Sequence, residues 1–462
     1  MGLRSFLGIL PPKLSYSFEI APVEEISLPS IIRLLWPKAT ASDLALGVGD
    51  TVMTGQDLAR SGKGPFISVV SGKITDISPF LGLYKERHTA VTIEPGPHDL
   101  YDTGLNPMDE FNKADPFELR TAITRAGFDT FSSITKDMSE WPPIKTLIIT
   151  ALDRDPSSLV NQQRFRDNNE NPEPAIELLL RSTGASRCIL IVPEHLRDMT
   201  RPFSQDLATI QLVPPVYPNG LPELLANNFG KGLLIRGTTE GFIGDTVVVG
   251  IDHALDMMLS LRNGRPLMKK TITFSSSMDQ KILNYRVRIG TPVAVILEKA
   301  GVNLQPEGKL IMDGKMRGYA CYSDQQPITA STESVLIQAP SHVFSFQQSA
   351  CINCGRCNAI CPVNLEVNFL GRCSEYGLFS RCITLGAENC IDCGLCAYVC
   401  PSHRPLVQLI SHAKQVIRSH PLQPIPEEES LSREMNAHPL PAVRLFETVP
   451  EERNKAGGDP RP

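Results

Sequence analysis

The chain has 462 residues, of which 42% are hydrophobic and 21% charged, and its formal net charge at pH 7 is −5. A chain of this length is too long for one compact core, so we expect several domains. The composition is that of a globular protein, and because no basic stripe stands out, we expect no nucleic-acid partner.

The sequence also argues against membrane insertion and export. No apolar run is long enough to span a bilayer as a helix. The segment Met1–Leu10 is apolar but leads into Pro11 and Pro12 without a cleavage-site pattern, which is not typical of a signal peptide. We therefore expect the protein in the cytoplasm, where it would meet a membrane only at its surface or through partners.

Residues 1–110 predict a sandwich-like domain of short β-strands. The segment Pro65–Ser78 alternates and carries a turn signal at Ser71–Gly72, and His88–Glu94 has the pattern of another strand.

Residues 111–262 predict an α/β domain. A helix is expected to begin at Asp115, an N-cap residue followed by Pro at the first helical position. Strands are then predicted at Thr146–Thr150 and Arg187–Val192, with a helix at Glu173–Arg181 between them. Strand, helix and strand joined by short links are typical of a parallel α/β unit.

Residues 263–340 predict a small α+β domain. Lys269–Phe274 and Ser334–Ile337 have strand patterns, and Thr291–Ala300 has the spacing of a helix.

Ten of the twelve cysteines lie between Cys351 and Cys400. In a chain without an export signal, this density predicts metal ligation instead of disulfides. Two copies of the spacing C-x2-C-x2-C-x3-C-P are present, and this spacing is that of bacterial two-cluster ferredoxins. The copies contain Cys351, Cys354, Cys357 and Cys361, and Cys390, Cys393, Cys396 and Cys400.

In such motifs the fourth cysteine binds the cluster of the other copy. We therefore predict two [4Fe–4S] clusters, with Cys351, Cys354, Cys357 and Cys400 (the first set) binding one, and Cys390, Cys393, Cys396 and Cys361 (the second set) binding the other. Gly355 and Gly394 stand where a side chain would crowd a cluster. The alternative is zinc, whose sites use two CxxC pairs or Cys/His mixtures and leave no role for the third cysteine.

Three residues near the motifs match no ligand position. Cys373 and Cys382 lie between the copies, and we expect them to be buried apolar residues, with a redox role as the alternative. His403 follows the second copy, and we expect it at the surface and not as a residue that tunes a cluster.

Behind the motifs, Leu406–Ile417 has one apolar face, so residues 341–420 predict a helical domain. From Pro421 to the last residue, 462, Pro, Glu and Arg dominate. We expect residues 421–462 to form a disordered tail that contacts a partner.

Several segments together resemble the C subunit of the Rnf electron-transport complex, and the cysteine segment is the most specific of them. Thr150–Pro156 and Tyr217–Pro222 are closer to the A subunit of the sodium-translocating NADH:quinone reductase, a related family without these cysteines. The segments that resemble the Rnf protein are Gly8–Pro12, Ser68–Ile74, Ile289–Pro292, Ile311–Gly318, Gln326–Thr329 and Cys351–Ile417.

The resemblance implies an α+β multidomain fold with a lipoyl-like β-sandwich, a Rossmann-like α/β domain, an SLBB (β-grasp) domain and a helical two-[4Fe–4S] ferredoxin-type domain, in this order. It also implies integral-membrane and flavin-bearing subunits of an Rnf-type complex as partners. Soluble ferredoxin or NADH would be the electron source, and the protein would lie at the inner face of the cell membrane.

The family's Gly-rich loop for flavin and nucleotide, G-x-G-G-A-G-F-P, is only partly matched. Ala126, Gly127 and Phe128 agree with it, whereas Arg125 replaces a glycine and Asp129 replaces the proline. Backbone N–H groups approach a phosphate where no Cβ intervenes, and a nearby carboxylate repels it. The acidic patch after the first α/β strand is altered too, to Asp153–Asp155. We therefore expect FMN and NADH to bind weakly or not at all.

Three functional hypotheses remain. The chain relays electrons through two clusters, or it is the flavin-binding NADH dehydrogenase module of the complex, or it is a quinone-linked subunit of a related complex. The loop residues favour the relay, and analogy with the family favours the dehydrogenase.

Overall fold

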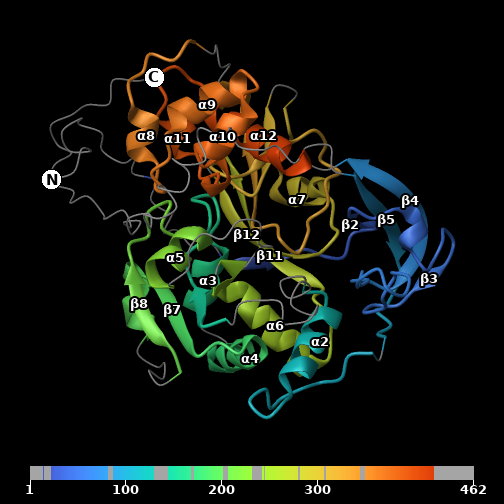
Figure 1. The fold of residues 1–462 in the computed structure, drawn as a ribbon. Helices are drawn as coiled ribbons and strands as arrows, with labels where there is room; N and C mark the ends of the chain where they lie inside the picture. Colours follow the sequence, from blue (N-terminus) through green and yellow to red (C-terminus); the bar gives the residue numbers. More distant parts are fainter. Residues whose placement is uncertain are drawn as a thin grey trace.

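The computed structural model has a mixed α/β architecture with several sheets (Figure 1). Its architecture confirms the expected combination of sheets and helices, while the domain boundaries and the finer domain types stay predictions. The predicted tail, residues 421–462, and Asp129 lie outside the described residues. Those residues are 14, 22–81, 87–102, 104–128, 144–167, 171–200, 207–230, 242–243, 245–278, 281–305, 308–343 and 349–420.

The N-terminal sheet is antiparallel, with the strand order β2-β5-β4-β3. Its strands are β2 (Ile32–Pro37), β3 (Thr51–Val52), β4 (Gly72–Leu81) and β5 (Arg87–Pro95), and the 3-10 helix η1 (Ala41–Asp43) lies between β2 and β3. The strand predicted at His88–Glu94 is confirmed as part of β5. The inner strand β5 has a run of buried residues from Thr89 to Ile93.

The strand predicted before the Ser71–Gly72 turn is wrong. Residues 66 and 68–71 are buried, and apart from an isolated bridge between Ile67 and Asp57 the segment is irregular, so that only β4, which starts at Gly72, is a strand. Ser68 explains the difference, because its hydroxyl donates to the carbonyl oxygen of Val70 at 2.7 Å within this segment. Such local side-chain bonds compete with the regular ladder of a strand.

A five-stranded sheet has the order β8-β7-β6-β10-β9, in which the first four strands are parallel. The strands predicted at Thr146–Thr150 and Arg187–Val192 are confirmed as β6 and β7. The strands are β6 (Thr146–Thr150), β7 (Arg187–Pro193), β8 (Thr209–Val213), β9 (Phe242–Ile243) and β10 (Thr246–Gly250). The helices around them are α2 (Pro116–Arg125), α3 (Val160–Asp167), α4 (Glu173–Thr183), η5 (Glu194–Thr200), α5 (Pro222–Phe229) and α6 (Ile251–Asn263).

Helices cover both faces of this sheet. Leu147 and Ile149 of β6 belong to a core shared with α4 and α6, whereas Ile148 packs on the opposite face with Leu225 of α5. Strands buried on both faces are continuously apolar, as the sequence of β6 is. The predicted start of α2 is confirmed, because the Asp115 carboxylate accepts the backbone N–H of Phe117 at 2.8 Å.

A six-stranded sheet has the order β1-β12-β11-β15-β13-β14. Its first strand comes from the N-terminal part of the chain and pairs in parallel with β12, a link that the sequence pattern did not predict. The predicted helix within Thr291–Ala300 is confirmed as α7. The elements are β1 (Val23–Glu25), β11 (Lys269–Ser276), β12 (Ile282–Arg288), α7 (Val293–Ala300), β13 (Lys309–Met312), β14 (Tyr319–Cys321), β15 (Ser334–Gln338) and η6 (Pro340–His342).

The cysteine-rich segment forms short helices, which Figure 1 shows in orange and red at one end of the molecule. They are α8 (Arg356–Ile360), α9 (Val367–Glu375), α10 (Phe379–Thr384), η7 (Ala387–Asn389), α11 (Leu395–Tyr398) and α12 (Leu406–Ser419). The amphipathic helix predicted after the motifs is confirmed as α12, which buries Leu406, Ile410 and Ala413. Among the described helices, none has the length and apolar character needed to cross a membrane.

Candidate metal centre

The two cysteine motifs have the same backbone conformation. Both motifs place residues with positive φ at three equivalent positions, and α8 and α11 begin at equivalent points after the glycine of each loop. The equivalent pairs are Asn353 (φ 56°) with Asp392 (52°), Gly355 (73°) with Gly394 (80°), and Asn364 (56°) with His403 (47°). Asn, Asp and Gly tolerate this left-handed region better than other residues, so the local sequence favours a repeated loop.

Each loop is also closed by equivalent side chains. The Cys351 thiol donates to Oδ1 of Asn353 at 3.8 Å, and the Cys390 thiol donates to Oδ1 of Asp392 at the same distance. A cation from a later helix then holds each loop. Arg372 of α9 donates to Oδ1 of Asn353.

Lys414 of α12 has the corresponding role in the second loop. Its ammonium donates to the carbonyl oxygen of Cys390 at 2.8 Å and pairs with the Asp392 carboxylate. Lys414 is only 7% exposed, so this contact is internal to the fold.

The thiols gather into two groups of four. Burial raises the pKa of Cys357 to about 11, and Cys400, Cys354 and Cys351 are close enough to add to the rise. Burial likewise raises the pKa of Cys396, and the nearby thiols of Cys393, Cys390 and Cys361 add to this rise. Each group thus contains one cysteine from the other copy, Cys400 or Cys361, and the groups have the same members as the first and second sets.

The donor groups fit four-iron clusters. In the part of the chain that the structure describes, no group of three or more His, Cys, Asp or Glu side chains is arranged around a single metal ion. Thiolates that bind a four-iron cluster attach to different irons and therefore need not converge on one point. The all-thiol donor groups, with no His in either set, are those of the predicted clusters. Iron ligation itself stays a prediction.

The two sets differ in exposure. In the first set Cys354 is exposed and Cys351 and Cys400 are half-buried. In the second set Cys361, Cys393 and Cys396 are buried. The first set therefore lies nearer the surface, and the second lies inside the protein.

The second set is buried against the five-stranded sheet domain. Tyr217, which precedes α5 and is 1% exposed, donates its hydroxyl to the carbonyl oxygen of Cys393 at 2.5 Å. Leu221 and Leu224 share the apolar core of the cysteine motifs. At Gly394, a Cβ would lie 2.6 Å from the carbonyl oxygen of Met316, so this glycine is needed for a close backbone approach as well as for its positive φ.

The residues outside the ligand sets behave largely as expected. Cys373 (9% exposed) and Cys382 (0% exposed) are buried in the same core. Burial raises the pKa of the Cys382 thiol to about 12. His403 is exposed.

Two of the three loop residues proposed for flavin and nucleotide, Ala126 and Phe128, lie in the protein core, and Gly127 is half-buried. Ala126 and Phe128 are 0% and 1% exposed. The backbone N–H of Leu267 donates to the carbonyl oxygen of Ala126 at 2.7 Å, and the Phe128 ring meets the His253 ring edge-on at 5.1 Å. Gly127, with φ +87°, makes the turn between them. These side chains stabilise the packing of α2 and do not face a cavity.

The strand order reverses between β6 and β10, and at such a point α/β sheets commonly bind ligands beyond the carboxyl ends of the strands. Here the Asn161 side chain lies against the start of α6. The backbone N–H of Asp252, in the first turn of α6, donates to Oδ1 of Asn161 at 3.2 Å, and a Cβ on Gly250 would lie 2.6 Å from the same oxygen. An N–H group that would otherwise suit a phosphate therefore already has an internal acceptor.

The altered acidic patch after β6 also faces the protein. Asp153 is fully buried, and it accepts the backbone N–H of Asn161 and the side-chain amide of Gln162, both at 2.8 Å. Burial raises the pKa of its carboxyl to about 7. Asp155 binds a different part of the chain, because its carboxylate accepts the backbone N–H groups of Lys315 and Met316 at 3.1 and 2.8 Å.

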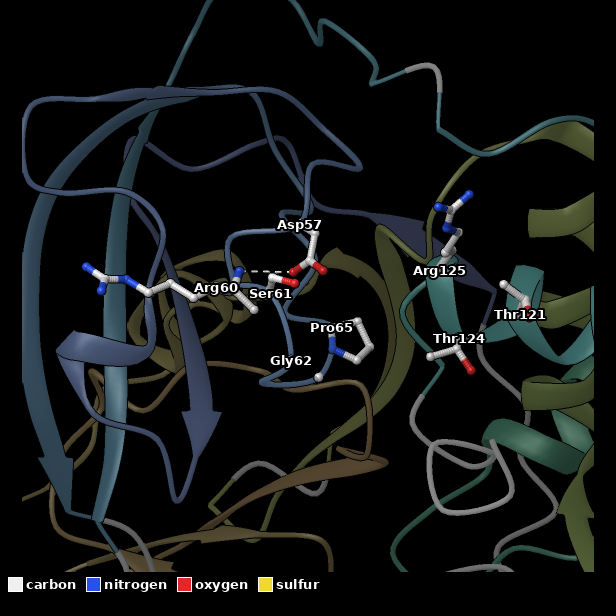
Figure 2. A pocket seen from close by; sticks show the side chains of 10 residues that line it. Asp57, Arg60, Ser61, Gly62, Pro65, Thr121, Thr124 and Arg125 are labelled. Carbon is white, nitrogen blue, oxygen red and sulfur yellow. Dashed lines mark hydrogen bonds between the residues drawn. The ribbon is translucent and has the colours of Figure 1, made fainter. Parts of the chain in front are cut away.

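A cavity of about 420 Å³ lies between the loop Asp57–Pro65 and helix α2 (Figure 2). Arg60 and Arg125 line it, but Figure 2 shows their guanidinium groups pointing away from one another. Backbone carbonyl oxygens already accept from both, at Leu44 (2.7 Å) and Gly104 (3.2 Å). The two cations therefore do not converge on an anionic ligand.

Sequence reasoning missed Asp155, Tyr217 and Arg317 as residues of this site. Each lies in a segment that resembles the related families, but nothing in their spacing indicates that Tyr217 contacts Cys393 or that Asp155 holds the backbone of Met316 and Arg317. The sequence distance from Tyr217 to Cys393 is 176 residues. Only the packing of the five-stranded and six-stranded sheets and the helical segment brings them together.

No family profile matches the chain. It is similar to curated proteins named as the C subunit of an ion-translocating oxidoreductase complex. The protein of Rhodobacter capsulatus is 28% identical over 429 residues, which cover 88% of this chain and 82% of the relative. The protein of Yersinia pestis is 27% identical over 382 residues, which cover 78% of this chain and 60% of the relative.

A third relative, from Methanosarcina acetivorans, is 35% identical over 168 residues, 36% of this chain and 37% of its own. Among solved structures, a chain of an NAD+-reducing [NiFe]-hydrogenase is 16% identical with a TM-score of 0.39, and the match covers 75% of this chain and 71% of that one. A score this low carries no functional information. The sequence matches confirm the resemblance to the Rnf protein that the motifs predicted.

Proposed function

The chain is similar over most of its length to the C subunit of ion-translocating oxidoreductase complexes, and from this premise we propose that it is the electron-transfer subunit of an Rnf-type complex. It relays electrons through two [4Fe–4S] clusters. The first set of cysteines, Cys351, Cys354, Cys357 and Cys400, binds one cluster, and the second set, Cys390, Cys393, Cys396 and Cys361, binds the other.

One observation carries the proposal. Two loops with the same sequence of positive φ angles surround two groups of four thiols, and each group takes its fourth member from the other loop. When bound, each cluster accepts and releases one electron at a time. The exchange of Cys361 and Cys400 ties the two halves together and holds the two sites close to one another.

The difference in exposure gives the two sets different roles. The first set, with Cys354 exposed and Ile352 66% exposed, is the one accessible to a partner protein. In the second set three cysteines are buried and Cys390 is half-buried, and Tyr217, Met316 and Lys414 of α12 contact its loop. We assign the exchange of electrons with a partner to the first set and internal transfer to the second.

The partners in this proposal are the integral-membrane and flavin-bearing subunits of the complex, with soluble ferredoxin or NADH as the distal electron source. The chain lies on the cytoplasmic face of the membrane, where these subunits present their electron-carrying groups. The alternative of a flavin-binding NADH dehydrogenase module lacks support in this chain, because Ala126 and Phe128 are core residues and Asn161 accepts the backbone N–H of Asp252 at the start of α6.

Iron analysis tests the proposal. The intact chain, purified or reconstituted anaerobically, should hold about eight irons and eight acid-labile sulfides, as two cubanes require. Two irons or fewer after reconstitution, or stoichiometric zinc, would refute the relay. Reduction with dithionite should then produce the paramagnetic signals of two clusters.

A further inference from the structure

The second cysteine loop contacts another loop, Gly314–Arg317, which lies between β13 and β14. The carbonyl oxygen of Met316 closely approaches Gly394, in the middle of the second motif. Arg317 directly follows Met316, and while burial raises the pKa of the Cys393 thiol, the Arg317 charge opposes that rise. The position of this one cation relative to the second set therefore depends on how firmly the loop Gly314–Arg317 is held.

Asp155 holds this loop through its backbone. The Asp155 carboxylate, in a residue 2% exposed, accepts the backbone N–H groups of Lys315 (3.1 Å), Met316 (2.8 Å) and Arg317 (3.4 Å). A Cβ at Gly314 would lie 2.0 Å from the Asp155 carboxylate carbon, so the backbone sits directly on this carboxylate. A carboxylate with several N–H donors is a strong anchor because charge-assisted hydrogen bonds are stronger than neutral ones.

The side chain of Arg317 is held separately. Its two terminal nitrogens donate to the two carboxylate oxygens of Glu223, in α5, at 3.3 and 3.5 Å. The side chains of Arg317 and Glu223 are 28% and 23% exposed. Both ends of the arginine are therefore fixed by carboxylates of the α/β domain, and the guanidinium carries a permanent charge at any physiological pH.

We propose that Arg317 raises the reduction potential of the cluster bound by Cys390, Cys393, Cys396 and Cys361, with Asp155 as the residue that positions it. This inference rests on the proposed function. A cluster that takes up one electron without a proton becomes more negative, so a fixed cation beside one of its ligands favours the reduced form. Net charge and hydrogen bonding around a cluster determine its potential.

Arg372, near the first set, provides a control cation. Its counterpart in the second loop is Lys414, which all the variants below retain. Arg372 contacts Asn353 in the first loop and belongs to α9, whereas Arg317 belongs to the loop against the second motif. Removing the charge at Arg317 should affect only the second cluster, and removing the charge at Arg372 should leave the second cluster unchanged.

The test is a redox titration of the intact, iron-loaded chain, followed by EPR with dithionite as the reductant. Signals are assigned first with Cys396→Ala and Cys357→Ala, which each disturb one cluster. Arg317→Gln should shift the midpoint potential of the second cluster downward, whereas Arg317→Lys, which keeps the charge, should leave it close to that of the unmodified chain. Arg372→Gln should not move it.

A second variant covers the case in which Arg317→Gln loses iron. Glu223→Gln keeps Arg317 but removes its counter-charge, so it should shift the same potential upward. An unchanged potential in both variants, or equal shifts in Arg317→Gln and Arg317→Lys, would overturn the inference while the relay stands. A chain that never reaches about eight irons would instead refute the proposed function.

Discussion

At the scale of single residues, Asn353 and Asp392 shape the two cysteine loops. Each stands two positions after the first cysteine of its motif. Asn353 and Asp392 accept from the thiols of Cys351 and Cys390 and hold the backbone in the left-handed region. A short polar side chain can do both because it bonds locally at a position where most residues are strained. The cysteines then have a prearranged loop from which to bind metal.

The exchange of the fourth cysteines leads to a prediction about which cluster each variant damages. Cys361→Ala should damage the cluster of Cys390, Cys393 and Cys396, because Cys361 belongs to that group. Cys400→Ala should damage the cluster of the first motif for the same reason. Each variant should keep about four irons.

Iron analysis together with EPR of the two variants distinguishes the clusters. If Cys361→Ala removed the signal that Cys357→Ala also removes, each cysteine would serve its own motif, and the assignment of the two sets would be wrong.

At the scale of elements, the two glycines of the loops face different surroundings. Both Gly355 and Gly394 have positive φ, but only Gly394 approaches another part of the chain, the carbonyl oxygen of Met316. Among the residues that the structure describes, none apart from its chain neighbours has an atom within 4 Å of a Cβ added at Gly355. The same substitution at the two sites therefore separates backbone strain from crowding.

Gly355→Ala should lower the free energy of unfolding by about 1–2 kcal/mol, the cost of a left-handed residue with a side chain. Gly394→Ala should cost more and should also lower iron occupancy of the second cluster, because the loop Gly314–Arg317 must move. Urea denaturation of the iron-loaded chain, with iron content measured in parallel, checks this. Equal losses at both positions would mean that the contact with Met316 contributes nothing.

The turn after α2 leads to a prediction about organic cofactors. Ala126 and Phe128 are buried, and one glycine, Gly127, remains between them. A phosphate needs several N–H groups without Cβ atoms in the way, so the chain should bind FMN and NADH weakly or not at all.

Fluorescence quenching in a titration of the chain with FMN measures this binding. Binding of FMN, the opposite result, would depend on Arg125, because its guanidinium is a suitable partner for phosphate. Micromolar or tighter binding that disappears in Gly127→Val would show that this turn binds flavin, and the dehydrogenase hypothesis would then replace the relay.

At the scale of the whole molecule, the helical cysteine segment is not an independent appendage. Its core includes Tyr217, Leu221 and Leu224 from the segment between β8 and the end of α5, and Met316 packs against it from the loop between β13 and β14. The second set of cysteines therefore depends on residues from three parts of the chain. This arrangement rigidly connects the two cysteine sets to the rest of the protein.

Truncation at Pro421 should leave both clusters in place. The described part of α12 already supplies the apolar face that packs on the cysteine core, and residues 421–462 contain few apolar residues. Iron content and thermal stability of the shortened chain should equal those of the intact chain, while assembly with the other subunits should weaken. Loss of iron on truncation would show that the tail packs against the clusters.

The sequence by itself was enough to predict the chemistry of the site. The type of ligand, the spacing within each motif and the left-handed positions are local properties, so two copies of one pattern were enough to predict two ligand sets. Strands such as β6 and helices such as α12 were also predictable, because their apolar periodicity is local. The irregular segment before Gly72 was not, because Ser68 satisfies its backbone through side-chain bonds that periodicity does not encode.

Only the tertiary structure decided what surrounds each ligand set. Asp155 binds a loop that follows it by 160 residues, and Tyr217 binds Cys393 at a distance of 176 residues. Such contacts depend on how sheets and helices pack, which no short pattern specifies. The burial of Ala126 and Phe128 could not be predicted for the same reason. A sequence match with a binding loop does not show which way its side chains face.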